Sequence, residues 1–404
     1  MNILFLHPNF PAQFKTPCIR LAKNKKHDIK FICQTHYGRG IDGIEKLTLK
    51  GSGSHQSIIN NSKNESERQL SRAKAYRGGF ELLKRGQWKP DVVIGHSGWG
   101  CGIYVKEIWP DTTFISYLEW WFNPESELVN CLKNNENFEL TDESITKLWI
   151  RNMPSALEMA TANLIITPSE WQKEQLPQLL KDNCRVIPDE IDKNIFFPNH
   201  NKLSSHPVVT YGTRGMEPMR GFPEFIKILP QLLKKWPQLV VEIAGSDTVS
   251  YGGKLPKEKT WKAWALKIFE SEHLTERIIW KGTMPLKDYA DWLKSSWCHV
   301  YLSEPFVTSW SFIEALHCHC PMVASATKAT QEFCEISPNI ITVDHKNLSK
   351  LFESINDRIR FSSNFSQSAP LIRHEDASKN SYLNETSETS LATIIADVEA
   401  TTMI

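Results

Sequence analysis

The chain has 404 residues, of which 41% are hydrophobic and 23% are charged, and its formal net charge is +1. This length predicts two domains, and the near-neutral charge excludes a general electrostatic attraction to nucleic acid or to an anionic membrane. No apolar run reaches the roughly 18 residues that cross a bilayer. The opening stretch, MNILFLHPNF, is too short in its apolar part for a signal peptide and is expected to form a strand. Nine cysteines without a secretion signal favour a reducing compartment, so we expect a cytoplasmic protein.

The first half of the chain alternates short apolar strands with helical patterns, which is typical of a parallel α/β sheet. The last of these helices contains Pro154, which is expected to interrupt or kink it. The basic residues of the long second helix could lie on an anionic surface, but a solvated face is the simpler reading. The predicted strands are 2–6, 28–33, 91–95, 113–117 and 163–167, and the predicted helices are 13–22, 65–85 and 144–162.

The alternation restarts after a seam near residues 188–206, so the fold class is α/β with two Rossmann-like halves. We expect domains at 1–190 and 191–360, followed by a polar tail at 361–404 with a final helix at 391–398. The second half has predicted strands at 208–211, 240–244, 278–280, 299–302 and 322–324, and predicted helices at 221–235, 257–270 and 286–295, with a further helix from Ser309.

The stretch YLSEPFVTSWSFIEALHCHCPMVAS, residues 301–325, reads as strand, loop, helix and strand. Glu314 lies inside the helix, where its carboxylate could accept hydrogen bonds from the hydroxyls of a ribose. The backbone N–H groups near Thr308 and Ser309 could hold phosphates at the helix start. Glu304, in the preceding loop, is a second candidate ligand. The alternative for both carboxylates is an ordinary surface, capping or loop charge.

Two loops after predicted strands of the second half carry further candidates. Arg214 and Arg220 lie in a Gly- and Pro-containing loop, and arginine is well suited to contact a diphosphate on which negative charge builds up. Surface arginines on a solvated loop are the alternative. The loop 245–253 carries the polar residues Ser246 and Tyr251, which line the same site or belong to an ordinary long loop.

In the first half, His96 follows a buried strand and precedes a glycine-rich turn. A histidine at such an edge can bind a sugar or transfer a proton, although a lone histidine is equally compatible with a structural role. Gly98, Gly100 and Gly102 form G-x-G-x-G, which differs from the dinucleotide-binding pattern G-x-G-x-x-G. Near Glu119, the side chain of Trp120 serves as an acceptor platform or as core packing.

The sequence His-Cys-His-Cys at residues 317–320 resembles a metal cluster by composition. Zinc sites of this kind usually need a second pair of ligands elsewhere in the chain, and no such pair is evident. We therefore expect no metal site.

Over residues 1–345 the chain resembles a family 4 glycosyltransferase with the GT-B architecture, in which two Rossmann-like domains face a cleft. The resemblance rests on an ordered set of segments: MNILFLHPNF, DVVIGH, ANLIITPSEW, RVIPDEIDKNIFFP, GTRGMEPMRGF and FIEALHCHCPMVAS. It departs from the family pattern at Phe306, which stands where an E-x7-E pair would have its first glutamate. It also departs in the tail, which carries no obvious helix that crosses back to the first domain.

The resemblance implies a retaining transfer of a hexose from a nucleotide diphosphate sugar to a hydroxyl acceptor, such as a glycan or a lipid-linked glycan. It implies no cofactor and no metal, no nucleic acid partner, and a location in the cytoplasm, at most against the inner face of the membrane. The alternatives are a nucleotide-sugar epimerase and a non-catalytic protein that binds nucleotide or carbohydrate. Motifs and resemblance together assign Arg214, Arg220 and His96 to catalysis, Glu119, Trp120 and Asn9 to the acceptor side, and Glu314, Glu304, Thr308, Ser309, Gly245, Ser246, Tyr251 and Gly282 to the donor.

Overall fold

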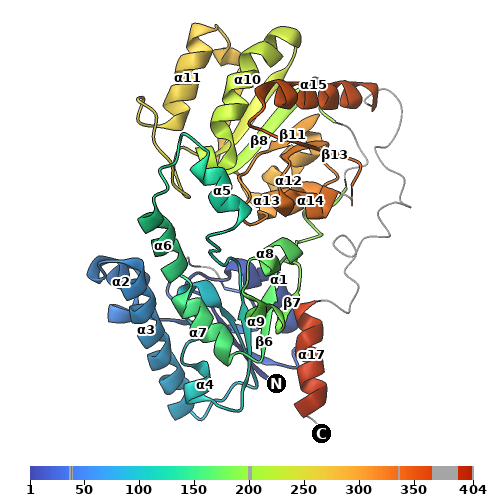
Figure 1. Ribbon diagram of the computed structural model, residues 1–404. Coiled ribbons are helices and arrows are strands. Elements are labelled where there is room, and N and C mark those ends of the chain that lie inside the picture. The colour runs from blue at the N-terminus through green and yellow to red at the C-terminus, as the bar shows by residue number, and fades with distance from the viewer. Residues whose placement is uncertain (36–37, 39, 199–202, 335–336, 366–389, 403–404) are drawn as a thin grey trace. The chain divides into compact units, whose positions relative to one another are not determined.

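The computed structural model describes residues 1–35, 38, 40–198, 203–334, 337–365 and 390–402. The chain divides into two compact units, each built on a parallel sheet with helices (Figure 1). The first unit contains Met1–Ser126, Asp142–Glu190 and Glu385–Ile404, and the second contains Glu127–Thr141 and Ile191–Asn384. The predicted α/β class is confirmed. None of the helices in the described part of the chain is long and apolar enough to span a membrane.

The sheet of the first unit has seven parallel strands. Because successive residues of a strand face opposite sides of a sheet, Ile3 and Phe5 of the first strand pack in one core cluster, and Leu4 and Leu6 pack in another. In sheet order the strands are β3 (Ile44–Thr48), β2 (Asp28–Cys33), β1 (Asn2–Leu6), β4 (Val92–His96), β5 (Thr113–Tyr117), β6 (Leu164–Thr167) and β7 (Cys184–Val186).

Helices cover both faces of this sheet. Side chains of α1 and α17 join the core cluster of Ile3 and Phe5, whereas α3 and α4 join that of Leu4 and Leu6. The helices of the first unit are η1 (Ala12–Phe14), α1 (Lys15–Lys23), η2 (Gly51–Gly53), α2 (His55–Asn61), α3 (Glu65–Arg85), η3 (Ser97–Trp99), α4 (Val105–Ile108), α6 (Asp142–Ile150), α7 (Met153–Thr161), α8 (Glu170–Glu174), α9 (Gln178–Lys181) and α17 (Leu391–Thr402).

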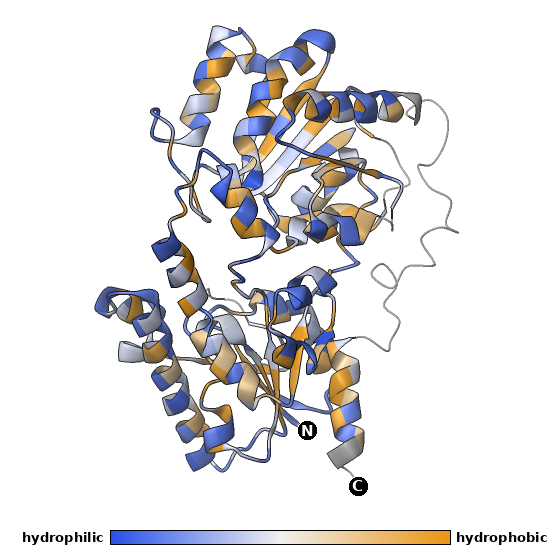
Figure 2. Cartoon of the chain, in the orientation of Figure 1, coloured by the Kyte–Doolittle hydropathy of each residue, from blue (hydrophilic) through white to orange (hydrophobic). Residues whose placement is uncertain are grey.

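The second unit has a six-stranded parallel sheet, on which hydrophobic segments alternate with paler, more polar ones in Figure 2. Its strands, in sheet order, are β10 (Ile278–Gly282), β9 (Val240–Ser246), β8 (Val208–Gly215), β11 (Cys298–Tyr301), β12 (Met322–Ser325) and β13 (Ile340–Val343). Its helices are α5 (Glu127–Lys133), η4 (Pro218–Arg220), α10 (Phe222–Lys235), α11 (Trp261–Ser271), η5 (Thr275–Arg277), α12 (Leu286–Ser295), α13 (Trp310–His317), α14 (Lys328–Cys334) and α15 (Leu348–Phe365).

In each sheet the order of the strands along the chain reverses at one point, the switch point. In the first unit β1 lies between β2 and β4, and in the second unit β8 lies between β9 and β11. In open α/β sheets ligands bind outside the carboxyl ends of the strands at such a switch point. The residues that follow β1 and β4, and those that follow β8 and β11, are therefore the places to look for function.

Three sequence expectations are corrected. The helix expected at 144–162 is interrupted, but before Pro154 and not by it: two helices meet at Asn152, whose side chain hydrogen-bonds both the N–H and the C=O of Phe122 at 2.9 Å each. Pro154 lies in the first turn of α7, where a missing N–H costs nothing. Helix α15 continues to Phe365, beyond the expected start of the tail, whose residues 366–389 lie outside the described part of the chain.

The third correction concerns the C-terminus. The sequence shows no obvious helix that returns to the first domain, yet α17 packs on the first unit beside α1. Leu391, Ile394 and Ile395 are buried there in the core cluster of Ile3 and Phe5. The last described helix thus completes the core that the first residues of the chain begin.

Candidate functional site

At the switch point of the second unit, the turn after β8 presents the buried side chain of Arg220, which is 6% exposed. The next residue, Gly221, has φ +60°, and a Cβ on it would lie 2.5 Å from the Cβ of Leu302. Glycine therefore allows this turn to approach the segment after β11. Arg220 Nη1 donates to the Ser303 hydroxyl at 2.9 Å, and the Tyr211 hydroxyl donates to the Arg220 carbonyl at 2.6 Å.

A tyrosine from a third segment holds the guanidinium from another side. The Arg220 Cζ lies 4.8 Å from the ring centroid of Tyr251, in the loop after β9. The carboxylate of Glu217 accepts the backbone N–H groups of Ser250 and Tyr251 at 2.9 and 2.8 Å, which ties this loop to the arginine turn. Burial by itself lowers the pKa of Arg220, but Tyr301, Tyr251 and Glu217 outweigh it and raise the pKa above its ordinary value. The site therefore holds a permanent, oriented positive charge.

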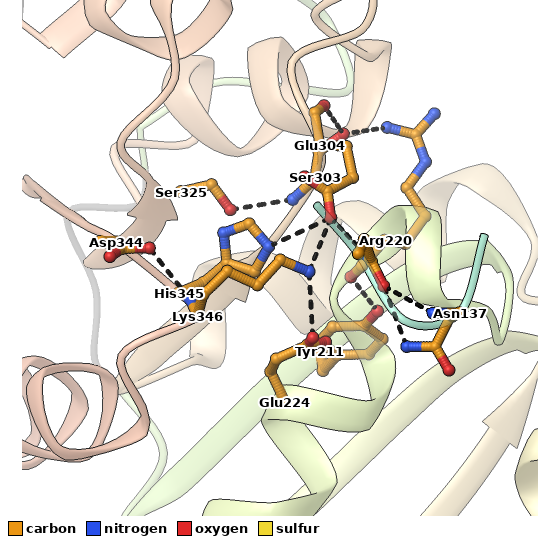
Figure 3. A network of polar contacts seen from close by, with 11 residues as sticks. Asn137, Tyr211, Arg220, Glu224, Ser303, Glu304, Ser325, Asp344, His345 and Lys346 are labelled. Carbon is orange, nitrogen blue, oxygen red and sulfur yellow. Dashed lines mark hydrogen bonds and ion pairs between the residues drawn. The ribbon is translucent and has the colours of Figure 1, made fainter. Parts of the chain in front are cut away.

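Glu304, three residues after β11, lies in a network of polar contacts and is 2% exposed (Figure 3). Its carboxylate accepts from Lys346 Nζ at 2.6 Å and from Asn135 Nδ2 at 2.9 Å, and His345 Nε2 lies 4.0 Å away. Lys346 also reaches Glu224 on α10 at 3.0 Å. Burial lowers the pKa of Lys346, but Glu304 and Glu224 outweigh burial and raise it. The carboxylate of the predicted donor ligand Glu304 is thus held by neighbours on two separate segments.

One other predicted position, Gly245, lies where backbone approaches backbone. Gly245 on β9 has φ +133°, and a Cβ there would lie 2.1 Å from the carbonyl oxygen of Thr213. The structure therefore requires glycine at this position. Ser246 is the last residue of β9, and Gly282 is the last residue of the edge strand β10. Arg214 lies in the last part of β8 and is exposed, unlike Arg220.

Helix α13 carries Glu314 as its fifth residue, with a half-buried side chain. Ser309 occupies the N-cap position without capping through its side chain, and its hydroxyl donates to Tyr301 at 3.1 Å. The Thr308 hydroxyl donates to the Ala329 carbonyl at 2.7 Å, which anchors the loop before the helix. Helix α13 therefore begins at the end of the loop that follows β11 and carries Ser303 and Glu304.

At the switch point of the first unit, His96 ends β4 and is 2% exposed. Its Nε2 lies 3.3 Å from the carboxylate of Glu119, which follows β5. The ring of His7, just after β1, lies 4.9 Å from that of His96, and His7 Nδ1 accepts the N–H of Asn9 at 2.8 Å. The structure therefore brings the predicted residues His96, Glu119 and Asn9 to one edge of the first sheet. Trp120 is 9% exposed and packs 6.2 Å from Trp171.

Within the described residues, no group of three or more His, Cys, Asp or Glu side chains is arranged to hold a metal ion. In the His-Cys-His-Cys stretch, burial lowers the pKa of His317 to about 4 and raises the pKa of the Cys318 thiol to about 12. The Cys320 thiol donates to the Leu293 carbonyl at 3.1 Å. These side chains pack around the end of α13 as part of the core.

Sequence reasoning missed several residues of both sites. Lys346 follows β13, a strand that the pattern did not reveal, and Asn135 lies 169 positions from its partner Glu304. The sequence did contain a signal for Arg72. It lies four and eight residues before Tyr76 and Phe80, so it shares the buried face of helix α3 with them. The residues missed in the second unit are Asn135, Glu217, Glu224, Ser303, His345 and Lys346, and those missed in the first unit are His7, Gln34, Arg72 and Trp99.

The fold and site define an α/β protein with two parallel-sheet units and a charged site at a switch point of the strand order. Two family models match consecutive parts of the chain: "Glycosyl transferase family 4 group" at residues 25–196 and "Glycosyl transferases group 1" at residues 192–360. The chain belongs to the group 1 glycosyltransferases and is a transferase. Comparison with curated proteins finds no match.

Solved structures support the same fold. Sucrose-phosphate synthase from Thermosynechococcus elongatus has a TM-score of 0.69 at 14% identity, covering 100% of this chain and 98% of its own. HepE from Anabaena in complex with UDP-glucose has a TM-score of 0.64 at 15% identity, covering 100% and 99%. A glycosyltransferase from Rickettsia africae has a TM-score of 0.61 at 15% identity, covering 98% and 96%. The expected GT-B fold is confirmed.

Proposed function

We propose that the protein transfers a hexose from a nucleoside diphosphate sugar to a hydroxyl of an acceptor, a glycan or lipid-linked glycan, with retention of the anomeric configuration. The observation that carries the proposal is the fixed guanidinium of Arg220 at the switch point of the second sheet, bonded to Ser303 and placed over Tyr251. The similar HepE structures contain UDP and UDP-glucose, which supports UDP as the first nucleotide to test.

In this mechanism the diphosphate is the leaving group, and negative charge grows on it as the glycosidic bond breaks. Arg220 stabilises that charge without reorganising, because Ser303 and Tyr251 already hold it in place. The start of α13 adds backbone N–H groups, and Glu314 accepts hydrogen bonds from the ribose hydroxyls. These positive groups fill the role of a divalent metal, so the reaction proceeds without one.

Retention follows when the acceptor hydroxyl attacks from the face that the diphosphate leaves, and the departing phosphate takes the hydroxyl proton. No protein nucleophile forms a covalent intermediate in this scheme. In the first unit, the pair of His96 and Glu119 orients the acceptor. Glu119 can only accept when ionised, so the bond between the two places a proton on His96 Nε2.

The test is a thermal-shift titration of the full chain with UDP, GDP, ADP and CDP, repeated with Glu314→Ala. One nucleotide should raise the melting temperature of the wild-type protein, and Glu314→Ala should weaken its binding by about tenfold or more. Glu353→Ala is the matched control, because Glu353 is an exposed carboxylate on α15 of the same unit.

Catalysis is tested next with the nucleotide sugar of the preferred base. Proton NMR should show donor consumption and a product with the anomeric configuration of the donor. Inversion at the anomeric carbon would refute the retaining mechanism. The absence of a shift with all four nucleotides would refute the assigned donor site.

A further inference from the structure

Arg72 of the first unit is a buried cation whose hydrogen bonds reach only neutral groups. It is 2% exposed, Nε donates to Gln34 Oε1 at 2.9 Å, and Nη1 donates to the Trp99 carbonyl at 3.2 Å. Among the described residues Nη2 has no hydrogen-bond acceptor, and no carboxylate pairs with the guanidinium. Burying an unpaired charge is costly, and such a charge is usually balanced by a counter-ion.

Two unused hydrogen-bond donors lie beside this cation. The guanidinium carbon is 5.2 Å from the ring centroid of Trp99, whose buried Nε1–H has no partner in the part of the chain that the structure describes. The ring of His7 lies 6.2 Å from that of Trp99. His7 Nδ1 lies 2.8 Å from the Asn9 N–H and 3.1 Å from the Asn9 carbonyl oxygen. The shorter contact requires the Nδ1 lone pair, so we place the ring proton on Nε2, which meets no acceptor among the described side chains.

The histidine near Arg72 is electrically neutral. Burial, then His96 and then Arg72 lower the pKa of His7 well below its ordinary value, against a smaller opposing effect of the Asn9 backbone. A neutral His7 keeps its Nε2–H as a donor and adds no second buried charge. Arg72, Trp99 and His7 therefore present one positive charge and several donors without a complementary acceptor.

The position of these residues also points to a ligand. His7 follows β1, and His96 ends β4, so the two flank the switch point of the first sheet. The buried face of α3 is apolar at Tyr76 and Phe80 but turns polar at Arg72, where it reaches this edge. The edge lies close to the surface, because the neighbouring Glu119 side chain is 42% exposed.

We propose that Arg72, Trp99 and His7 bind an anionic group of the acceptor, a phosphate or a carboxylate. This inference rests on the proposed function, since it assigns the acceptor its chemical class. Arg72 pairs with the anion through Nη2, and the Trp99 and His7 N–H groups donate to its oxygens. The acceptor hydroxyl that receives the sugar then lies on the side of His96.

The experiment compares three probes by isothermal titration calorimetry of the full chain saturated with UDP: glucose, glucose 6-phosphate and glucuronate. Saturation with UDP fills the diphosphate site, so that a phosphate probe reports on the first unit. An anionic probe should bind about tenfold or more tightly than glucose. The phosphate and the carboxylate probes show which anion is preferred.

Arg72→Gln should abolish the preference for the anionic probe. Trp99→Phe keeps the ring but removes the N–H, and it should weaken the anionic probe by about threefold or more. Arg85→Gln is the matched control, because it removes an exposed cation from the same helix. Its binding should equal that of the wild-type protein.

Equal binding of glucose and both anions by the wild-type protein would overturn the inference, as would an anion preference that survives Arg72→Gln. If Arg72→Gln does not fold, Trp99→Phe decides: unchanged binding of the anionic probe in that variant would overturn the inference. UDP binding is measured separately in the same samples and tests the proposed function alone. If UDP does not bind to the wild-type protein, the proposed donor site is refuted, whereas the preference for an anionic probe is still decided by Arg72→Gln.

Discussion

Lys346 Nζ lies 2.6 Å from the carboxylate of Glu304, although the two residues follow different strands of the second sheet. Lys346 follows β13, Glu304 follows β11, and the same ammonium group reaches Glu224 on α10. One lysine therefore fixes the carboxylate that stands next to Ser303, the partner of Arg220. The geometry of the proposed donor site depends on this ion pair.

Replacing this lysine should destabilise the second unit. Lys346→Met leaves the buried carboxylate of Glu304 without its cation, and we expect a loss of about 2 kcal/mol. The loss stays below that of a fully buried pair because the Lys346 side chain is 38% exposed. Urea unfolding measures it. The double variant Glu304→Gln/Lys346→Met should recover part of the loss, and equal stabilities of Lys346→Met and wild type would contradict this account.

Arg220 and Arg214 should differ in their contributions to turnover. Arg220→Lys loses the fork geometry that contacts Ser303, and we expect kcat for donor consumption to fall about 100-fold. Arg214→Lys is the paired variant, since Arg214 is exposed on β8. Its effect should be below about tenfold. Equal losses in the two variants would mean that burial does not distinguish their roles.

Tyr251 should act on Arg220 through its ring. Tyr251→Phe preserves the aromatic face 4.8 Å from the guanidinium, whereas Tyr251→Leu removes it. A cation–π contact of about 1–2 kcal/mol corresponds to a loss of roughly 5–30-fold in kcat/KM for Tyr251→Leu. Tyr251→Phe should lose less. Steady-state kinetics of donor consumption compares the two, and the reverse order would contradict a role for the ring.

Acid should destabilise the protein through buried neutral histidines. Burial lowers the pKa of His299 from 6.5 to about 3. The unfolded chain therefore binds a proton that the folded chain does not, and stability is lost as the pH falls below 6.5 towards 3. This group contributes about 1.4 kcal/mol per pH unit in that window. His299→Asn, which can keep the contact to Thr210, should show a shallower decline of the free energy of unfolding between pH 6 and 4. Parallel declines would refute the assignment.

The C-terminal helix should stabilise the first unit. Ile395 is 1% exposed in the core beside α1, so Ile395→Ala should cost about 2–4 kcal/mol in urea unfolding. Asp397→Asn changes an exposed position of the same helix and should stay within about 0.5 kcal/mol of wild type. A similar small change for both would show that α17 contributes little to the core.

The sequence predicted those elements whose apolar pattern and end signals agree. Strands β1, β2 and β5 and helices α3 and α12 have the predicted bounds. Helix α3 begins after Asn64, whose side chain accepts the N–H of Glu67, and ends before Gly86. Strand β3 escaped prediction because it is half-exposed and carries Glu45 and Lys46, so its apolar pattern is weak.

Local reasoning found site residues that follow strands and missed those that depend on distant partners. Arg220, Tyr251 and Glu304 come after predicted strands, which is why the sequence points to them as candidates. Lys346 and Asn135 reach Glu304 only through the tertiary fold. The basic residues of the helix at 65–85 predict a solvated or membrane-facing surface, but the structure buries one of them, Arg72.

The place of α17 has a consequence for biosynthesis. The ribosome releases the strands of the first unit early, but Leu391, Ile394 and Ile395 are synthesised only after the strands of the second unit. Until then the nascent first unit exposes the apolar surface of α1 that these side chains cover. Cutting the gene after the codon for residue 190 would therefore yield a fragment with an unfinished core, because the first unit needs a helix that is synthesised after the second unit.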